Sequence, residues 1–165
     1  MLLLFEPFQL QNKLTVRKMS PYFTFFRKFT IRSKDFSIYC KPDAHHGAIL
    51  KIAQATVPDG KMVVNKIYAN LDVATELCER LNALEYLYQE TRPLPRNGRL
   101  HFEEIVEQDS TYKLDFSVKE YRQNLEMTQS KKILTLGPCD SINIPDVREF
   151  RRELLHLVEE LSNNN

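Results

Sequence analysis

Two side chains that suit nucleic-acid binding alternate in the segment FSIYCK, residues 36–41. Tyr39 and Lys41 stand two residues apart, which places both on one face of an extended strand. A tyrosine ring can stack on a base, and a lysine ammonium can neutralise a phosphate, so the pair fits a single-stranded polynucleotide. The alternative is an exposed strand tyrosine that covers a neighbouring side chain. Both interpretations stay open at this point.

Other basic and polar residues fall at outward positions of neighbouring predicted strands. Arg122 and Asn124 can contact a base edge or a phosphate, although a turn between strands favours the same residue types. The set of candidate binding residues is Tyr39, Lys41, Lys51, Lys113, Lys119, Arg122 and Asn124.

Catalytic and metal-binding motifs are absent from the sequence. No Gly-x-Ser-x-Gly, HExxH or glycine-rich phosphate loop occurs, and the chain has only four glycines. His45 and His46 lack a third ligand at a zinc-like spacing. We therefore expect a protein that is not an enzyme and that carries no metal and no cofactor.

The remaining titratable residues have simple structural interpretations. Cys40 and Cys78 lie inside predicted elements and are expected in the core, and three widely spaced cysteines without a CxxC indicate a reducing, intracellular compartment. Glu103, Glu104 and Glu107 are expected to form a solvated strand edge.

The charge is unevenly distributed along the 165 residues. The formal net charge is +1, yet residues 1–28 alone carry +4 and the rest of the chain −3. The predicted helices, 72–90 and 146–162, hold ten carboxylates and four arginines, so the remainder of the folded region is +3. A polyanion would thus meet the strands and not the helices. No apolar run is long enough to span a membrane.

The first 28 residues are basic, apolar and poor in acid, which resembles a mitochondrial presequence. The segment lacks serine enrichment, and Pro7 and Pro21 interrupt a long amphipathic helix. The alternative is an extension without a targeting role, in which case we expect a nuclear or cytoplasmic protein.

Hydrophobic periodicity predicts four strands and then a helix, and the same order again. The first strand is predicted from Tyr22 to Ile31 and leads into the first unit, 29–90, which has further strands at 36–41, 48–57 and 62–69. A helix over 72–90 follows, with Asp72 as its N-cap. Glu85 is expected on a polar face of this helix. A linker, 91–98, leads to the second unit, 99–162, with strands at 99–108, 112–119, 124–129 and 132–137. Its helix, 146–162, begins with a capping box formed by Asp146 and Glu149.

Three pairs of positions support an internal duplication. Lys41 and Lys119, which end equivalent strands, are 78 residues apart; the segments LKIAQ (50–54) and LEMTQ (125–129) are 75 apart; the Asp-Val helix starts are 74 apart. The fold class is therefore predicted as α+β, with two ββββα repeats that form one domain. One repeat cannot bury both its sheet face and its helix stripe, so we expect that neither half folds alone.

The segment GAILKIAQ, followed by a hairpin and an acidic amphipathic helix, resembles the PUR repeat, whose second strand typically reads Gly-Arg-Phe-Leu-Lys-Ile. The segment VKEYRQNLEMTQSKKILTLGPCDSINIPDVREFRREL looks like a diverged copy. The resemblance covers residues 30–162. It implies two intertwined repeats related to Whirly folds, which bind single-stranded DNA or RNA on the outward sheet faces without catalysis.

Only some of the positions typical of the PUR repeat are matched in this sequence. Lys41 and Lys119 match the basic residue that ends the first strand, and Lys51 matches the outward lysine of the second strand, where the second half has Glu126. The family's turn asparagine is replaced by Asp43 and Tyr121, and its Arg-Phe by Ala48-Ile49 and Gln123-Asn124. A second hypothesis is therefore a fold relative that acts as an assembly subunit of a larger complex. We also expect a homo-oligomer, with Leu155 and Leu157 of the last helix left over for an interface.

Overall fold

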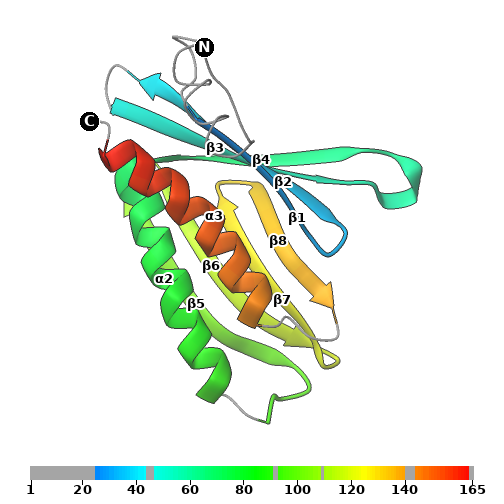
Figure 1. The fold of residues 1–165 in the computed structure, drawn as a ribbon. Coiled ribbons are helices and arrows are strands. Elements are labelled where there is room, and N and C mark those ends of the chain that lie inside the picture. Colours follow the sequence, from blue (N-terminus) through cyan, green and yellow to red (C-terminus); the bar gives the residue numbers. More distant parts are fainter. Residues whose placement is uncertain (1–24, 44–46, 91–92, 109, 140–143, 164–165) are drawn as a thin grey trace.

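The computed structural model describes residues 25–43, 47–90, 93–108, 110–139 and 144–163 (Figure 1). The first four strands pair in sequence order into one antiparallel sheet, here called sheet A, which is followed by helix α2. Their bounds are β1 Phe25–Ile31, β2 Lys34–Asp43, β3 Gly47–Thr56, β4 Val63–Asn70 and α2 Leu71–Glu90. A short 3-10 turn, η1 Pro58–Gly60, lies in the β3–β4 connection, where Gly60 has the positive φ of 77° expected of its PDGK turn.

The next four strands form a second antiparallel sheet, sheet B, which is followed by helix α3. Their bounds are β5 Gly98–Glu107, β6 Ser110–Lys119, β7 Arg122–Gln129, β8 Lys132–Cys139 and α3 Ile144–Asn163. The predicted α+β class and the order of the elements are confirmed. Predicted strand 22–31 starts at Phe25 in the described part of the chain, because residues 22–24 lie outside it.

Alternating side chains build the core as the sequence pattern predicts. Phe36, Ile38 and Cys40 of β2 point inward and are almost fully buried, in one hydrophobic cluster with the stripes of both helices. The buried helix residues are Val73, Leu77, Leu81 and Leu84 of α2, and Val147, Phe150, Leu154, Leu157, Val158 and Leu161 of α3. One hydrophobic cluster spans both halves of the chain, which explains why they form a single body.

Each helix also contacts the sheet of the other half. The ring of Phe150 on α3 packs edge-on against Phe29 of β1 and Phe36 of β2, with centroid distances of 6.0 and 5.3 Å. An ion pair of 2.7 Å between Arg27 of β1 and Glu153 of α3 lies on the same interface. Helix α2 in turn contacts β5 as well as β3 and β4, and the two helices lie side by side (Figure 1).

A buried carboxylate holds the two helices together. Glu85 of α2 accepts hydrogen bonds from Nε of Arg148 at 3.0 Å and Nε of Arg151 at 3.2 Å, both on α3. The expectation that Glu85 lies on a polar face of its helix is wrong, because its side chain is only 9% exposed. A buried carboxylate is tolerated here because it is paired with two guanidinium groups.

Two glutamines close the edges where the sheets meet. The Gln54 side chain on β3 donates to the backbone oxygen of Thr135 on β8 at 2.8 Å and accepts from its N–H at 2.9 Å. Reciprocally, Gln129 of β7 accepts from the N–H of Tyr68 on β4 at 2.7 Å, and the Tyr112 hydroxyl donates to the Tyr68 oxygen at 2.7 Å. Gln54 thus supplies β8 with both hydrogen bonds that a further strand would make, whereas on β4 Gln129 and Tyr112 supply one each.

The starts of both helices differ from the predicted ones. The side chain of Asn70 accepts from the N–H of Val73 at 2.8 Å, so Asn70, and not Asp72, caps α2. Helix α3 begins at Ile144, which places Asp146 inside the first turn, where it binds the Arg32 guanidinium at 2.8 Å. Leu157 is fully buried, so the expectation that it is left over for an interface is wrong, whereas Leu155 is only partly buried against the core.

Replacing Gln54 by alanine should destabilise the fold by about 1–3 kcal/mol, because it leaves the N–H of Thr135 on β8 without its partner. The Thr135 carbonyl keeps a second donor, Nζ of Lys34, at 3.3 Å. Urea unfolding monitored by circular dichroism measures this loss. The matched control is Asn82→Ala, which removes an exposed amide on α2 and should stay within about 0.5 kcal/mol of the parent. Equal effects of the two changes would contradict an edge-closing role of Gln54.

Candidate functional site

The outer face of sheet A carries a row of aromatic and basic side chains across all four strands. Phe26 of β1 is the register partner of Tyr39 on β2, Tyr39 that of Lys51 on β3, and Lys51 that of Tyr68 on β4. Because alternate residues of a strand share a face, these four side chains lie on the side opposite the buried Phe36 and Ile38. We call these four residues the aromatic row.

The rings within the row differ in how accessible they are. The Tyr39 ring lies between its neighbours, 4.8 Å from the Phe26 centroid and 4.7 Å from Nζ of Lys51. Tyr39 is half-buried, whereas Phe26 and Tyr68 at the two ends are 37% and 43% exposed. The ring area most open to a planar ligand therefore belongs to Phe26 and Tyr68.

A second row beside the first has cations at its ends and small residues between them. Lys28 pairs with Ser37, Ser37 with Ala53, and Ala53 with Lys66. Because Ser37 and Ala53 are short, the face is hollowed there into a cavity of about 590 Å³, here called the outer groove. Its lining includes Lys28, Tyr39, Lys51 and Lys66.

The outer groove is electropositive. Three lysines line it against a single carboxylate, Asp35, which accepts a hydrogen bond of 2.7 Å from the Thr30 hydroxyl. Clustered lysines in a shallow hollow attract anions and concentrate them at the surface. The groove thus combines a positive potential with exposed rings at its border.

The structure distributes the predicted binding residues over two sheets. Tyr39 and Lys51 belong to the aromatic row, whereas the remaining residues with described side chains lie on sheet B. Those on sheet B are Lys113 and Lys119 of β6 and Arg122 and Asn124 of β7. Lys41 lies in β2 opposite Ile49, but its side chain is outside the described part, as are His45 and His46.

On the outer face of sheet B, Arg99 and Asn124 have acidic partners, whereas Lys113 and Lys119 are exposed. Arg99 binds Asp115 at 3.0 Å and lies over the Phe102 ring at 4.4 Å, and Asn124 donates to Glu126 at 3.1 Å. Sheet B therefore presents partly neutralised groups, in contrast to the three lysines of the outer groove.

Four members of the sheet A surface were missed by sequence reasoning: Phe26, Lys28, Lys66 and Tyr68. A usable signal existed, since period two puts Phe26 and Lys28 on one face of β1, and Lys66 and Tyr68 on one face of β4. Only the strand register shows that Lys28 and Lys66 line the same hollow and that Phe26 and Tyr68 lie in the row beside it.

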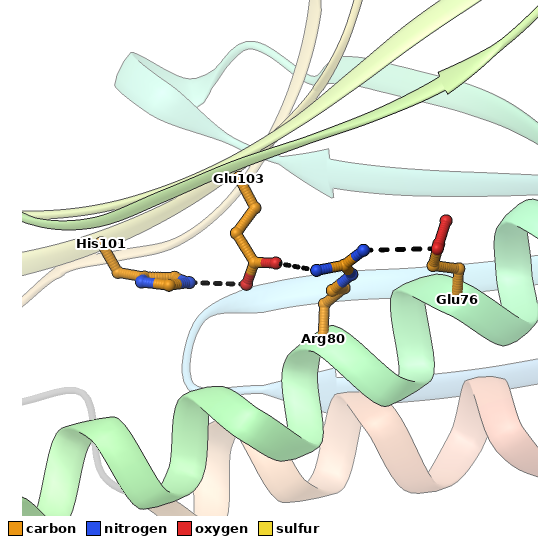
Figure 2. A network of polar contacts seen from close by, with 4 residues as sticks. All are labelled: Glu76, Arg80, His101 and Glu103. Atoms are coloured by element: carbon orange, nitrogen blue, oxygen red, sulfur yellow. Dashed lines mark hydrogen bonds and ion pairs between the residues drawn. The ribbon is translucent and has the colours of Figure 1, made fainter.

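A polar network joins α2 to sheet B (Figure 2). The Arg80 guanidinium of α2 binds Glu103 of β5 and, at 3.4 Å, Glu76, while Glu103 also contacts Nε2 of His101 at 2.5 Å. Burial raises the pKa of Glu103, but hydrogen bonds from His101 and Arg80 outweigh it and hold that pKa below its usual range. Glu103 is thus not part of a solvated strand edge, because its side chain is only 15% exposed.

The described residues offer no group of three metal ligands, and none of the described helices has an apolar stretch of membrane-spanning length.

Burial raises the pKa of the Cys40 thiol to about 11 and that of Cys78 to about 12. Both thiols stay protonated at neutral pH and are poor nucleophiles. Their expected place in the core is confirmed.

We predict that Cys40 and Cys78 resist alkylation at pH 8, since a pKa near 11 leaves about one thiolate in a thousand. Unfolding should make both react fully. Unfolded thiols ionise near pH 9 while the folded ones stay protonated, so stability should also fall as the pH rises above about 9. Peptide mass spectrometry after timed labelling separates these thiols from Cys139, and rapid labelling of the folded chain would contradict the prediction.

Glu103→Gln should lower stability at pH 7 by about 1 kcal/mol, a modest value because Arg80 is 41% exposed. The folded pKa of Glu103 lies below the unfolded one, so its contribution is present at neutral pH and is lost as the pH falls through the folded pKa. The variant should therefore lose less stability on acidification than the parent. Glu104→Gln, an exposed neighbour on β5, is the control for urea unfolding at pH 3–7.

No protein-family model matches the chain, and no curated protein matches it. The geometry and charge of the chain's own surfaces therefore indicate its function.

Proposed function

We propose that this protein binds single-stranded nucleic acid, RNA or DNA, on the outer face of sheet A and catalyses no reaction there. The observation that carries the proposal is the aromatic row next to the lysine-lined outer groove. Proteins that hold single strands combine a positive groove for the backbone with rings on which bases stack.

The arrangement suggests how a strand would lie. Lys28 and Lys66 stand on the two edge strands, and Lys51 stands between them, so that a backbone crossing the sheet passes three cations. Bases turned toward the row would meet Phe26 and Tyr68, the more exposed rings. Ser37 and Ala53 leave room for a backbone between the lysines.

The nucleic-acid proposal should be tested by the salt dependence of binding. The triple variant Lys28→Ala, Lys51→Ala, Lys66→Ala should flatten the log–log salt slope by about 2, since each phosphate contact on a single strand contributes about −0.7. Tyr68→Ala should weaken binding by about 1–3 kcal/mol with the slope unchanged, because stacking releases no ions. Fluorescence anisotropy with single-stranded oligonucleotides at several salt concentrations measures both quantities.

The matched control is the double variant Lys113→Ala, Lys119→Ala, which removes exposed cations from sheet B. It should change affinity and slope less than the triple variant does. If the folded triple variant and Tyr68→Ala both bind as the parent does, the assembly-subunit hypothesis replaces nucleic-acid binding.

We also propose that the two ββββα units are intertwined repeats of the PUR and Whirly type. Support comes from the contacts of α3 with β1 and of α2 with β5, and from the reciprocal bonds of Gln54 and Gln129, which occupy matching positions in LKIAQ and LEMTQ. Each repeat would then complete the core of the other.

Residues 99–165 expressed alone should fail to fold as a monomer. Without the first unit, Phe150 loses Phe29 and Phe36, and burial of a large apolar side chain contributes about 1.5–3 kcal/mol. Circular dichroism during urea titration is the measurement. A cooperative transition of the monomeric fragment would refute the intertwined arrangement, while recovery of structure on adding residues 1–98 would support it.

A further inference from the structure

The end of the β3–β4 hairpin is an exposed apolar surface next to the outer groove, and Val64 belongs to both. The hairpin reaches beyond the other strands and away from both helices (Figure 1). Its apolar residues are 61% exposed at Val57, 68% at Met62, 40% at Val63 and 49% at Val64. Clustered apolar side chains at this exposure mark an interaction surface.

The same segment has an open strand edge. β4 is an edge strand whose only pairing partner among the described strands is β3. The N–H and C=O of Tyr68 point away from β3, since they bond to Gln129 and Tyr112. By the period of two, the backbone groups of Lys66 and Val64 point to the same side. Within the described residues no hydrogen bond closes this part of the edge, in contrast to Tyr68.

An open edge strand accepts another strand, and one register makes β4 complementary to itself. If a two-fold axis passes between Val64 and Val64 of a second copy, Met62 of each copy lies opposite Lys66 of the other. Apolar side chains then meet, and no like charges oppose each other. An axis at Lys66 would instead set two ammonium groups side by side. The register centred on Val64 is therefore the favoured one.

We propose that a second copy of this chain docks antiparallel along β4 over residues 62–66, centred on Val64. The pairing satisfies the open backbone groups and covers Met62, Val63 and Val64. It joins the two copies of sheet A into one eight-stranded sheet, and their outer grooves then lie on one continuous face. The dimer does not depend on the proposed nucleic-acid binding, because its contacts are backbone groups and the hairpin's apolar side chains.

Sedimentation velocity of the full chain over a concentration series tests the dimer. The parent should dimerise, and Val64→Lys, which puts two charges at the axis, should raise the dimer Kd by about tenfold or more. The matched control is Val106→Lys, a 73%-exposed position on edge strand β5, which should leave the Kd unchanged. A parent that stays monomeric at high micromolar concentration overturns the proposal, and so does a dimer that Val64→Lys leaves intact.

Cysteine cross-linking tests the register. In the Val64-centred dimer the two copies of position 64 oppose each other at about 5.5 Å between Cα atoms, within disulfide reach. The two copies of position 66 are about four residues apart along the strands, roughly 13 Å, beyond that reach. Mild oxidation should therefore give a covalent dimer for Val64→Cys and none for Lys66→Cys. The parent chain, oxidised in the same way, shows how much covalent dimer the native cysteines form. A covalent dimer of Lys66→Cys and none of Val64→Cys overturns the register.

Discussion

Closing the sheet edges where the two halves meet is the constraint on which the rest of this structure depends. Two four-stranded sheets have edge strands whose backbone groups need partners, and burying them unpaired would cost about 1–3 kcal/mol each. Gln54 and Gln129 meet this need by bonding the backbone of β8 and β4. The amide of glutamine carries a donor and an acceptor in the geometry of a peptide group, which suits it to this role.

The two helices bridge the sheets as well. They lie beside each other, α2 contacts β3, β4 and β5, and α3 contacts β1. The buried Glu85 is paired with Arg148 and Arg151 and fixes how the helices meet, and Arg27 with Glu153 joins α3 to β1. Removing one partner of such a group is costly, because a buried charge then remains uncompensated.

The two sheets are alike in topology and unlike in surface. Sheet A has an outer face with a hollow between lysines and exposed rings at its border. Sheet B places acids such as Asp115 and Glu126 beside its basic and amide groups. The core residues of both halves face the same packing demands, whereas the outer faces are free to differ. The proposed binding function accordingly belongs to sheet A.

The amino-acid sequence by itself determined the elements of this protein. Period-two segments such as YKLDFSVK and the stripe of α3 predict which side chains are buried, because alternation and helical spacing are local properties. Tyr39 and Lys51 were also found as candidate site residues, since each lies at an outward position of its own strand. The predicted N-cap of α2, Asp72, lies two residues after the observed one, Asn70. Both are good capping residues, and only the hydrogen bond distinguishes them.

Only the tertiary structure decided which residues act together. Strand register brought Phe26 and Tyr68 into one row with Tyr39 and Lys51, although 42 residues separate Phe26 from Tyr68 in the chain. Glu85 and Glu103 look like ordinary surface acids in the sequence, yet Glu85 is buried and Glu103 largely enclosed, and arginines from other elements pair with both. The sequence left Leu157 as a candidate interface residue, whereas in the folded chain it is fully buried in the core. Pairing, charge compensation and enclosure are long-range contacts, and a local pattern contains no information about the partner.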